Sequence, residues 1–196
     1  MKKLVVVVAL ATMLAAGTAF ADHPDGWGIG LVGRYANIGI STGYGADMGG
    51  GLSLKIPGVP VFWAINLDLG SVYGYSWFGV GITGDYYIID KVLASEAFLH
   101  WYFGVGGFFN FLNYSYKYTW DDYSRTYMNF GVRVPVGLSF QPIPLLELFA
   151  EIAPSLGLNI VGGAEYRNEY GTQTTDKSEM KLYFKAPIGL GIRLWF

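Results

Sequence analysis

An all-β fold, an eight-stranded antiparallel up-and-down transmembrane β-barrel, is predicted from three observations. First, apolar and polar residues alternate along extended stretches, and a period of two indicates a strand whose successive side chains point to opposite sides. Second, the 196 residues are 52% hydrophobic, yet the apolar residues after the N-terminus are spread over alternate positions rather than gathered into a membrane helix. Third, the connections between the stretches alternate between short turns and longer polar segments.

The N-terminus has the features of a targeting segment. Two lysines precede an apolar run over residues 4–14, and an A-x-A cleavage site ends at Ala21. We therefore expect a signal peptide over residues 1–21 and a single outer-membrane β-barrel domain over residues 22–196. An uncleaved anchor is the alternative, although the apolar run is short for a membrane helix of about 20 residues.

The bulk composition excludes several classes of function. The chain carries 13 basic and 15 acidic residues, so no basic excess points to nucleic acid. It contains no cysteine, which excludes a disulfide framework and a thiolate metal site. Neither a cofactor nor a metal is expected. A water-soluble sandwich is the competing fold, but it would need shorter strands and more charge on its surface.

Eight stretches have strand character, and the last is far longer than the usual ~5–6 residues of a soluble strand. The expected strands cover residues 27–38, 46–56, 60–70, 75–89, 96–113, 125–141, 145–163 and 179–196. Pro135 and Pro154 fall inside two of them. Because proline cannot donate a ladder hydrogen bond, we expect a bulge or a local break near each. The first strand should pair with the last and close the barrel.

The connections indicate which end of the barrel faces outward. Short turns are expected at residues 56–59, 90–95 and 141–144, whereas longer or more polar connections are expected at residues 41–45, 71–74, 114–124 and 164–178. Outer-membrane barrels have short periplasmic turns and longer extracellular loops, with both termini in the periplasm. Eight strands therefore place the three short turns inside the cell envelope and the other four connections outside.

Charged residues on the strands fall on the non-apolar face. A lysine or arginine facing lipid near the bilayer midplane costs about 2–4 kcal/mol, so this face must point inward. Inward charges should be paired, because an isolated buried charge is very costly. The expected inward polar network consists of Arg34, Lys55, Asp68, Asp85, Arg133, Glu147, Glu151, Lys185 and Arg193. The interior of eight strands is just wide enough for side chains to fill, so we expect a charge-plugged barrel. A narrow pore or small-ligand transporter is the alternative.

The histidines do not favour an enzyme. The chain has two: His23 is expected to be disordered at the mature N-terminus, and His100 is expected to point inward and to be satisfied by a glutamate or a tyrosine. Nucleophilic catalysis needs a nucleophile and a base in contact, and no such motif surrounds His100. We therefore predict no catalytic residues. A lipid-modifying enzyme around His100 is the weaker alternative.

One expected outer loop is rich in aromatic residues. Tyr114, Tyr116, Tyr118 and Trp120 lie in the connection over residues 114–124. Exposed tyrosine and tryptophan are typical contact residues for a protein partner. These residues are therefore candidates for partner binding. The alternative is that they only extend a strand pair beyond the membrane.

The whole mature chain resembles the OmpA/OmpX-type eight-stranded barrels. Residues 100–111, residues 134–140 with 145–158, and residues 185–196 resemble an uncharacterised spirochaetal family of small OmpX-like outer-membrane proteins. This resemblance implies a bacterial outer-membrane location. Some members of that family are thought to bind host complement regulators, which implies an extracellular host protein as a partner, without a residue that can be carried over.

The resemblance also gives a role to the C-terminus. In such barrels a terminal aromatic residue and alternating apolar residues form the signal read by the barrel-assembly machinery, here Leu194 and Phe196. The expected partners are therefore outer-membrane lipid, the barrel-assembly machinery and the extracellular protein.

Overall fold

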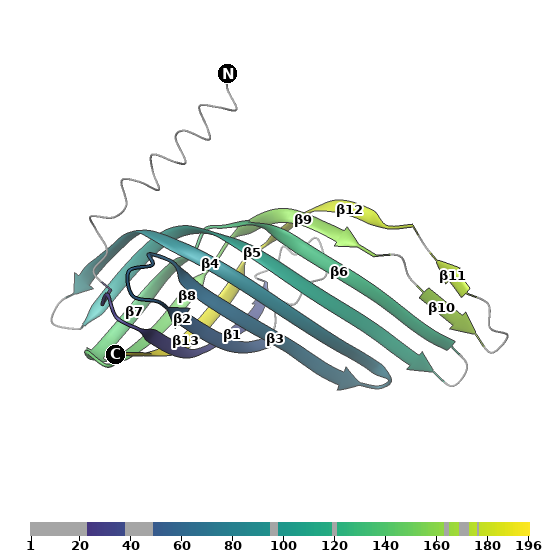
Figure 1. The fold of residues 1–196 in the computed structure, drawn as a ribbon, viewed down its shortest axis with the longest axis horizontal. Coiled ribbons are helices and arrows are strands. Elements are labelled where there is room, and N and C mark those ends of the chain that lie inside the picture. Colours follow the sequence, from purple (N-terminus) through teal and green to yellow (C-terminus); the bar gives the residue numbers. More distant parts are fainter. Residues whose placement is uncertain are drawn as a thin grey trace, which may run out of the picture.

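Strands dominate the chain, and they belong to one antiparallel sheet in the computed structural model (Figure 1). The structure describes residues 23–37, 49–94, 98–118, 121–162, 165–168, 173–175 and 177–196, so the predicted signal peptide lies outside the described residues. Within these ranges the strands are β1 (Gly28–Asn37), β2 (Gly49–Lys55), β3 (Phe62–Val72), β4 (Tyr75–Ala94), β5 (Leu99–Tyr118), β6 (Asp121–Arg133), β7 (Val136–Ile143), β8 (Leu146–Ile152), β9 (Ser155–Val161), β10 (Glu165–Asn168), β11 (Gln173–Thr175), β12 (Glu179–Lys185) and β13 (Pro187–Trp195).

The strand pairings close into a ring. β1 pairs with β2 on one side and with β13 on the other, Gly28 lying opposite Trp195 in the latter pair. β2, β3, β4 and β5 pair in chain order. β5 then pairs with β6 over one part of its length and with β7 over another. β6 pairs with β9, and β7 pairs with β8. β9 pairs in turn with β12, and β8 pairs with β13. The predicted pairing of the first strand with the last is confirmed.

Prolines divide three of the expected strands. Pro135 separates β6 from β7, and Pro154 separates β8 from β9, as predicted from the missing donor. A third break, at Ala186 before Pro187, separates β12 from β13. When each broken pair is taken as one strand, the ring has eight strand positions.

The two faces of the ring differ in chemistry. Exposed apolar residues on the outer face include Leu31, Leu52, Ile65, Leu67, Phe109, Val132, Leu138, Leu156, Leu182, Leu190 and Leu194. Buried polar residues on the inner face, which lines the lumen, include Asn66, Asp85, Asn110, Asn129, Arg133, Ser139, Glu147, Glu151, Asn159, Lys185 and Arg193. The alternation in the sequence therefore separates apolar residues outside from polar residues inside.

The two ends of the ring also differ (Figure 1). The terminal end holds Trp27, Phe196 and the turn between β2 and β3, where Gly58 adopts a positive φ of 70° and Val59 N donates to Ile56 O over 3.1 Å. The hairpin end holds the β3–β4, β5–β6 and β10–β11 connections.

The hairpin end shows where the predicted boundaries are wrong. Residues 114–118 continue β5 and residues 121–124 begin β6, so most of the expected loop over 114–124 is paired strand. The expected loop over 164–178 contains β10 and β11. Long paired hairpins satisfy their own backbone hydrogen bonds and therefore extend past the strand ends expected from the alternation.

Within the described residues, no helix is long and apolar enough to cross a membrane.

Candidate functional site

Three charged side chains from three strands meet in the middle of the lumen. Arg133 on β6 places Nε 3.3 Å from Asp85 Oδ1 on β4 and donates from Nη2 to Glu151 Oε1 on β8 over 2.6 Å. The hydroxyl of Tyr102 donates to the second oxygen of Glu151 over 3.3 Å. We call Asp85, Arg133 and Glu151 the middle cluster. One guanidinium bridges two buried carboxylates, which compensates charges that would otherwise be costly.

A second group of charges lies nearer the terminal end. Arg193 on β13 donates from Nη1 to Glu147 Oε2 on β8 over 2.7 Å, and Trp195 Nε1 donates to the same oxygen over 2.9 Å. His23 Nε2 lies 3.0 Å from Glu147 Oε1, and His23 Nδ1 contacts Asp90 Oδ2. The backbone N–H of His23 also donates to Asp90 Oδ2 over 3.1 Å. We call His23, Asp90, Glu147 and Arg193 the mouth cluster.

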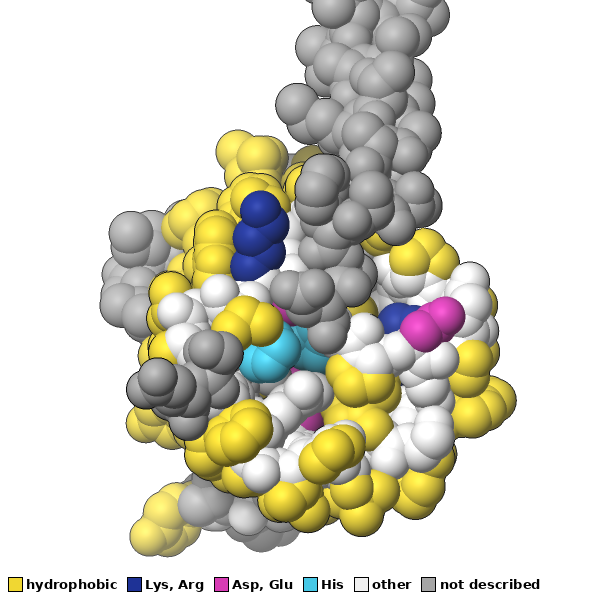
Figure 2. Space-filling model, turned by 90° about the vertical axis from the view of Figure 1, so that its left-hand side faces the viewer, with side chains coloured by type: hydrophobic (Ala, Val, Ile, Leu, Met, Phe, Trp, Pro, Cys, Tyr) yellow, Lys and Arg dark blue, Asp and Glu magenta, His cyan; other side chains and the backbone are white. Residues whose placement is uncertain are grey.

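The prediction that His23 is disordered is wrong. Its imidazole is buried and lies among the rings of Phe62, Tyr87, Tyr102 and Trp195, with centroids 5.3–6.1 Å away. Burial alone would lower the pKa of His23. The carboxylates of Asp90 and Glu147 raise it by more than burial lowers it, so the pKa is about 9, above the ordinary value of 6.5. The imidazole is therefore a cation at neutral pH. Figure 2 views the molecule from the terminal end and shows histidine side chains near the centre of the ring.

The other predicted network members lie outside the two clusters. Arg34 Nη2 donates to Thr83 Oγ1 over 2.9 Å, and Asp68 accepts a 2.8 Å hydrogen bond from Trp77 Nε1. Two lysines are also inside. Lys185 Nζ lies 4.3 Å from the ring centroid of Phe108, and Lys55 lies beside the turn between β2 and β3, where Nζ donates to Ile56 O over 3.0 Å.

The remaining predicted site residues lie at the two ends. Tyr114 and Tyr116 are half-buried strand residues of β5, whereas the side chain of Tyr118 and all of Trp120 lie outside the described residues. Leu194 and Phe196 are exposed on the outer face. Phe196 continues the β13 pairing past the strand, because its backbone N–H donates to Trp27 O over 2.8 Å and its carbonyl accepts from Trp27 N over 3.1 Å.

Glycines on the inner face make room for the large side chains. A Cβ atom at Gly106 would overlap the carboxylate of Asp85, and one at Gly137 would overlap the ring of Tyr102. A cavity of about 20 Å³ lies beside Arg34, Asp85, Glu151 and Arg193, which is space for about one water molecule. At this level the side chains fill the lumen.

The described residues of the lumen show no arrangement for a metal ion and no hydrogen-bond partner for His100 Nδ1. The described residues contain no group of three or more histidine or acidic side chains arranged to hold a metal ion. His100 Nδ1 is buried without a hydrogen-bond partner among the described residues, so the glutamate or tyrosine expected there is not in contact with this atom. The His100 ring lies 6.1 Å from that of His23.

Sequence reasoning missed His23, Asp90 and Trp195 as members of this site. Asp90 follows a β-bulge between Tyr87 and Ile89, which shifts the alternation by one residue and turns this carboxylate inward. His23 precedes the first strand, where no periodicity applies. The predicted network held five cations and four acids, so a missing inward acid such as Asp90 was the available signal.

The comparisons with known proteins concern the fold. The chain is similar to a major outer membrane protein from Thermus thermophilus, seen in a crystal structure, with a TM-score of 0.52 and 13% sequence identity. The match covers 85% of this chain and 98% of that protein. No protein-family model and no curated protein matches the chain. The narrower resemblance to OmpA/OmpX-type or spirochaetal barrels stays a prediction. The ring of strands and this likeness together support an outer-membrane type of β-barrel as the fold of the chain.

Proposed function

We propose that this chain is an eight-stranded up-and-down transmembrane β-barrel of the bacterial outer membrane, exported with a cleaved signal peptide. Its interior is closed by ion pairs, and its segments at the hairpin end bind a partner outside the cell. The observation that carries the proposal is the distribution of side chains over the two faces of the ring. Leucines and other apolar residues cover the outer face, and the charged clusters lie inside.

Energetics favour lipid around the outer face. Leu31, Leu69 and Val132 are each more than 60% exposed and belong to β1, β3 and β6, which lie at separate places around the ring. Soluble proteins rarely expose a continuous apolar surface of more than a few hundred Å². In lipid the same surface is solvated, and the pairing of β1 with β13 covers backbone groups that two open sheet edges would otherwise expose.

The filled interior favours a structural barrel over a pore. Large diffusion pores have about 16–18 strands, and the middle cluster occupies the lumen of this narrower ring. The test is to refold residues 22–196 into lipid vesicles and then to fuse them with a planar bilayer. We expect insertion without steady single-channel currents. Steady currents from pure protein would favour the narrow pore, and failure to insert would argue against the membrane location.

The hairpin end offers an aromatic surface for the partner. Tyr75 and Tyr116 lie opposite each other on β4 and β5 with ring centroids 4.2 Å apart, and Tyr114 lies 5.7 Å from Tyr75. Tyr73, in the turn between β3 and β4, is 94% exposed. Tyrosine offers a large apolar ring with a polar tip, which suits a protein interface.

Cysteine labelling tests which end faces outward, because the chain has no cysteine of its own. Tyr73 lies at the hairpin end and Leu145 lies at the terminal end, and both side chains are exposed. The two variants are Tyr73→Cys and Leu145→Cys. On intact cells a membrane-impermeant maleimide should label only Tyr73→Cys, whereas both variants should react after lysis. Labelling of Leu145→Cys alone on intact cells would reverse the proposed orientation.

A further inference from the structure

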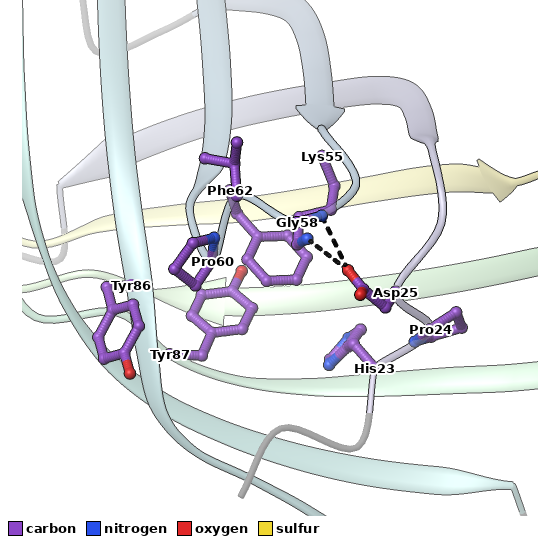
Figure 3. A pocket seen from close by; sticks show the side chains of 10 residues that line it. His23, Pro24, Asp25, Lys55, Gly58, Pro60, Phe62, Tyr86 and Tyr87 are labelled. Atoms are coloured by element: carbon purple, nitrogen blue, oxygen red, sulfur yellow. Dashed lines mark hydrogen bonds and ion pairs between the residues drawn. The ribbon is translucent and has the colours of Figure 1, made fainter. Parts of the chain in front are cut away.

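A cavity of about 310 Å³ lies at the terminal end, between the N-terminal segment and the β2–β3 turn. Figure 3 shows its lining side chains, which come from residues before β1, from the end of β2 and the turn after it, and from β3 and β4. Its volume is at the lower end of the range for small-molecule sites. None of the roles proposed above uses this cavity.

The charges along the cavity are unequally exposed. Lys55 and Asp25 form an ion pair in which Nζ and Oδ1 are 3.8 Å apart, longer than a hydrogen bond. The Asp25 side chain is 80% exposed, whereas that of Lys55 is 8% exposed. Asp25 Oδ1 accepts a 3.1 Å hydrogen bond from the backbone N–H of Gly58 (Figure 3). The carboxylate therefore stands in solvent at the rim, and the ammonium lies inside.

The ammonium of Lys55 has capacity for an additional acceptor. An ammonium group has three donors, and the carbonyl oxygen of Ile56 accepts one of them over 3.0 Å. His23 also lines the cavity, but Asp90 and Glu147 occupy both of its ring nitrogens, so its charge is already compensated. The acids behind His23, Asp90 and Glu147, are already occupied by contacts within the mouth cluster. The inner part of the cavity is therefore complementary to an anion.

The remaining wall is aromatic, and its rings present edges rather than open faces. The rings of Phe62 and Tyr87 are stacked with centroids 4.2 Å apart and an interplanar angle of 14°, and both line the cavity. Tyr86 also lines it, and its hydroxyl is buried without a hydrogen-bond partner among the described residues. Tyr87 is also stacked on Tyr102 with centroids 4.3 Å apart, and the guanidinium of Arg193 lies 4.8 Å from the Phe62 centroid. A ring-shaped apolar body can therefore pack edge-to-face against this wall.

We propose that this cavity binds a small organic anion, a carboxylate attached to a planar apolar ring. The carboxylate accepts from the ammonium of Lys55, and the ring packs along Phe62 and Tyr87. Because the binding residues lie in the folded protein itself, the site does not depend on the membrane location proposed above.

The test uses 4-fluorobenzoate and its neutral analogue 4-fluorobenzamide as fluorine NMR probes, with the refolded mature protein in detergent micelles. We expect the benzoate to bind at least about tenfold more tightly than the amide, because a hydrogen bond to a charged group contributes about 1.5–3 kcal/mol. Lys55→Met should remove this preference, and Lys55→Arg should keep it. Lys181→Met, whose side chain is exposed on β12, is the matched control and should bind as the parent does.

Two results would overturn the proposal: equal affinity for the two probes, or an unchanged preference in Lys55→Met. If Lys55→Met fails to fold, Asp25→Asn decides the matter, because it removes only the solvent-exposed charge at the rim. It should tighten benzoate binding a few-fold and leave the amide unchanged, whereas unchanged benzoate binding would contradict the proposed charge complementarity. Failure of this binding test leaves the vesicle insertion test untouched, so the two proposals can fail separately.

Discussion

The middle cluster and the mouth cluster both pair charges inside the lumen, but they use different parts of the chain. The middle cluster consists of strand residues alone, with Arg133 between Asp85 and Glu151. The mouth cluster needs His23, which precedes β1 and reaches Asp90 and Glu147 from outside the sheet. Closing the ring therefore assembles the middle cluster directly. The mouth cluster forms completely only when the N-terminal segment packs into the lumen and brings His23 to Asp90 and Glu147.

The largest expected effect follows from removing the cation of the middle cluster. Arg133→Met leaves two buried carboxylates without their shared partner, and breaking a buried ion pair costs about 3–5 kcal/mol. The measurement is the free energy of unfolding in urea in lipid vesicles. Lys181→Met provides the control, because its ion pair with Glu179 is exposed to solvent and should contribute little to stability. Equal losses in the two variants would show that the middle cluster does not stabilise the barrel.

A smaller effect is expected from filling the space beside the same cluster. A Cβ atom at Gly106 would overlap both the Asp85 carboxylate and the backbone carbonyl oxygen of Gly84. Gly106→Ala should therefore lower the free energy of unfolding by about 1–3 kcal/mol, the usual cost of overpacking. Gly50→Ala is the matched control, since nothing lies within 4 Å of a Cβ atom there, and it should change stability by less than about 0.5 kcal/mol. A neutral Gly106→Ala would mean that the Asp85 carboxylate and the backbone at Gly84 can both move without loss.

The mouth cluster should be less sensitive, because its members have additional partners. In His23→Ala, Glu147 keeps its bonds from Arg193 and Trp195, and Asp90 can still accept from the backbone of residue 23. We expect a loss of about 2–3 kcal/mol near neutral pH, measured by the same urea unfolding. A loss as large as that of Arg133→Met would remove the distinction between the two clusters.

The contribution of His23 should also depend on pH. Its pKa is about 9 in the folded protein, raised from 6.5, so the folded state binds the proton more tightly than the unfolded state. The stabilisation is therefore complete below about pH 6.5 and is lost as the pH rises through about 9. The difference in unfolding free energy between the parent and His23→Ala should shrink across this window. A difference that is constant from about pH 6 to 10 would contradict a protonated His23.

The two clusters also show what the sequence could predict. Strict alternation places Arg133, Glu147 and Arg193 on the inner face, and all three are buried there. Alternation does not say which acid meets which cation, because the contacts join side chains on strands far apart in the sequence. Nor can it anticipate the bulge that turns Asp90 inward, or a residue such as His23 that belongs to no strand. The residues of the middle cluster can therefore be predicted from the alternation of the strands, whereas the full membership of the mouth cluster depends on tertiary contacts.

The smallest expected effect on stability concerns Phe196, which lies on the outer face at the terminal end. Its ring is 71% exposed and makes no part of either cluster, and its backbone forms two hydrogen bonds with Trp27. Deleting Phe196 should lower the unfolding free energy of the refolded barrel by about 1 kcal/mol. If the terminal aromatic ring is an assembly signal, the same deletion should reduce the amount of inserted protein in cells several-fold.

Two further variants separate the ring of Phe196 from its backbone. Phe196→Ala keeps both hydrogen bonds with Trp27 and removes the ring, whereas Phe196→Tyr keeps the bonds and an aromatic ring. Phe196→Ala should therefore assemble poorly in cells while unfolding like the parent in vitro, and Phe196→Tyr should assemble normally. Normal insertion of Phe196→Ala would count against the assembly role. A large loss of stability in Phe196→Ala would instead show that the ring stabilises the terminal end, in the way that His23 does from inside.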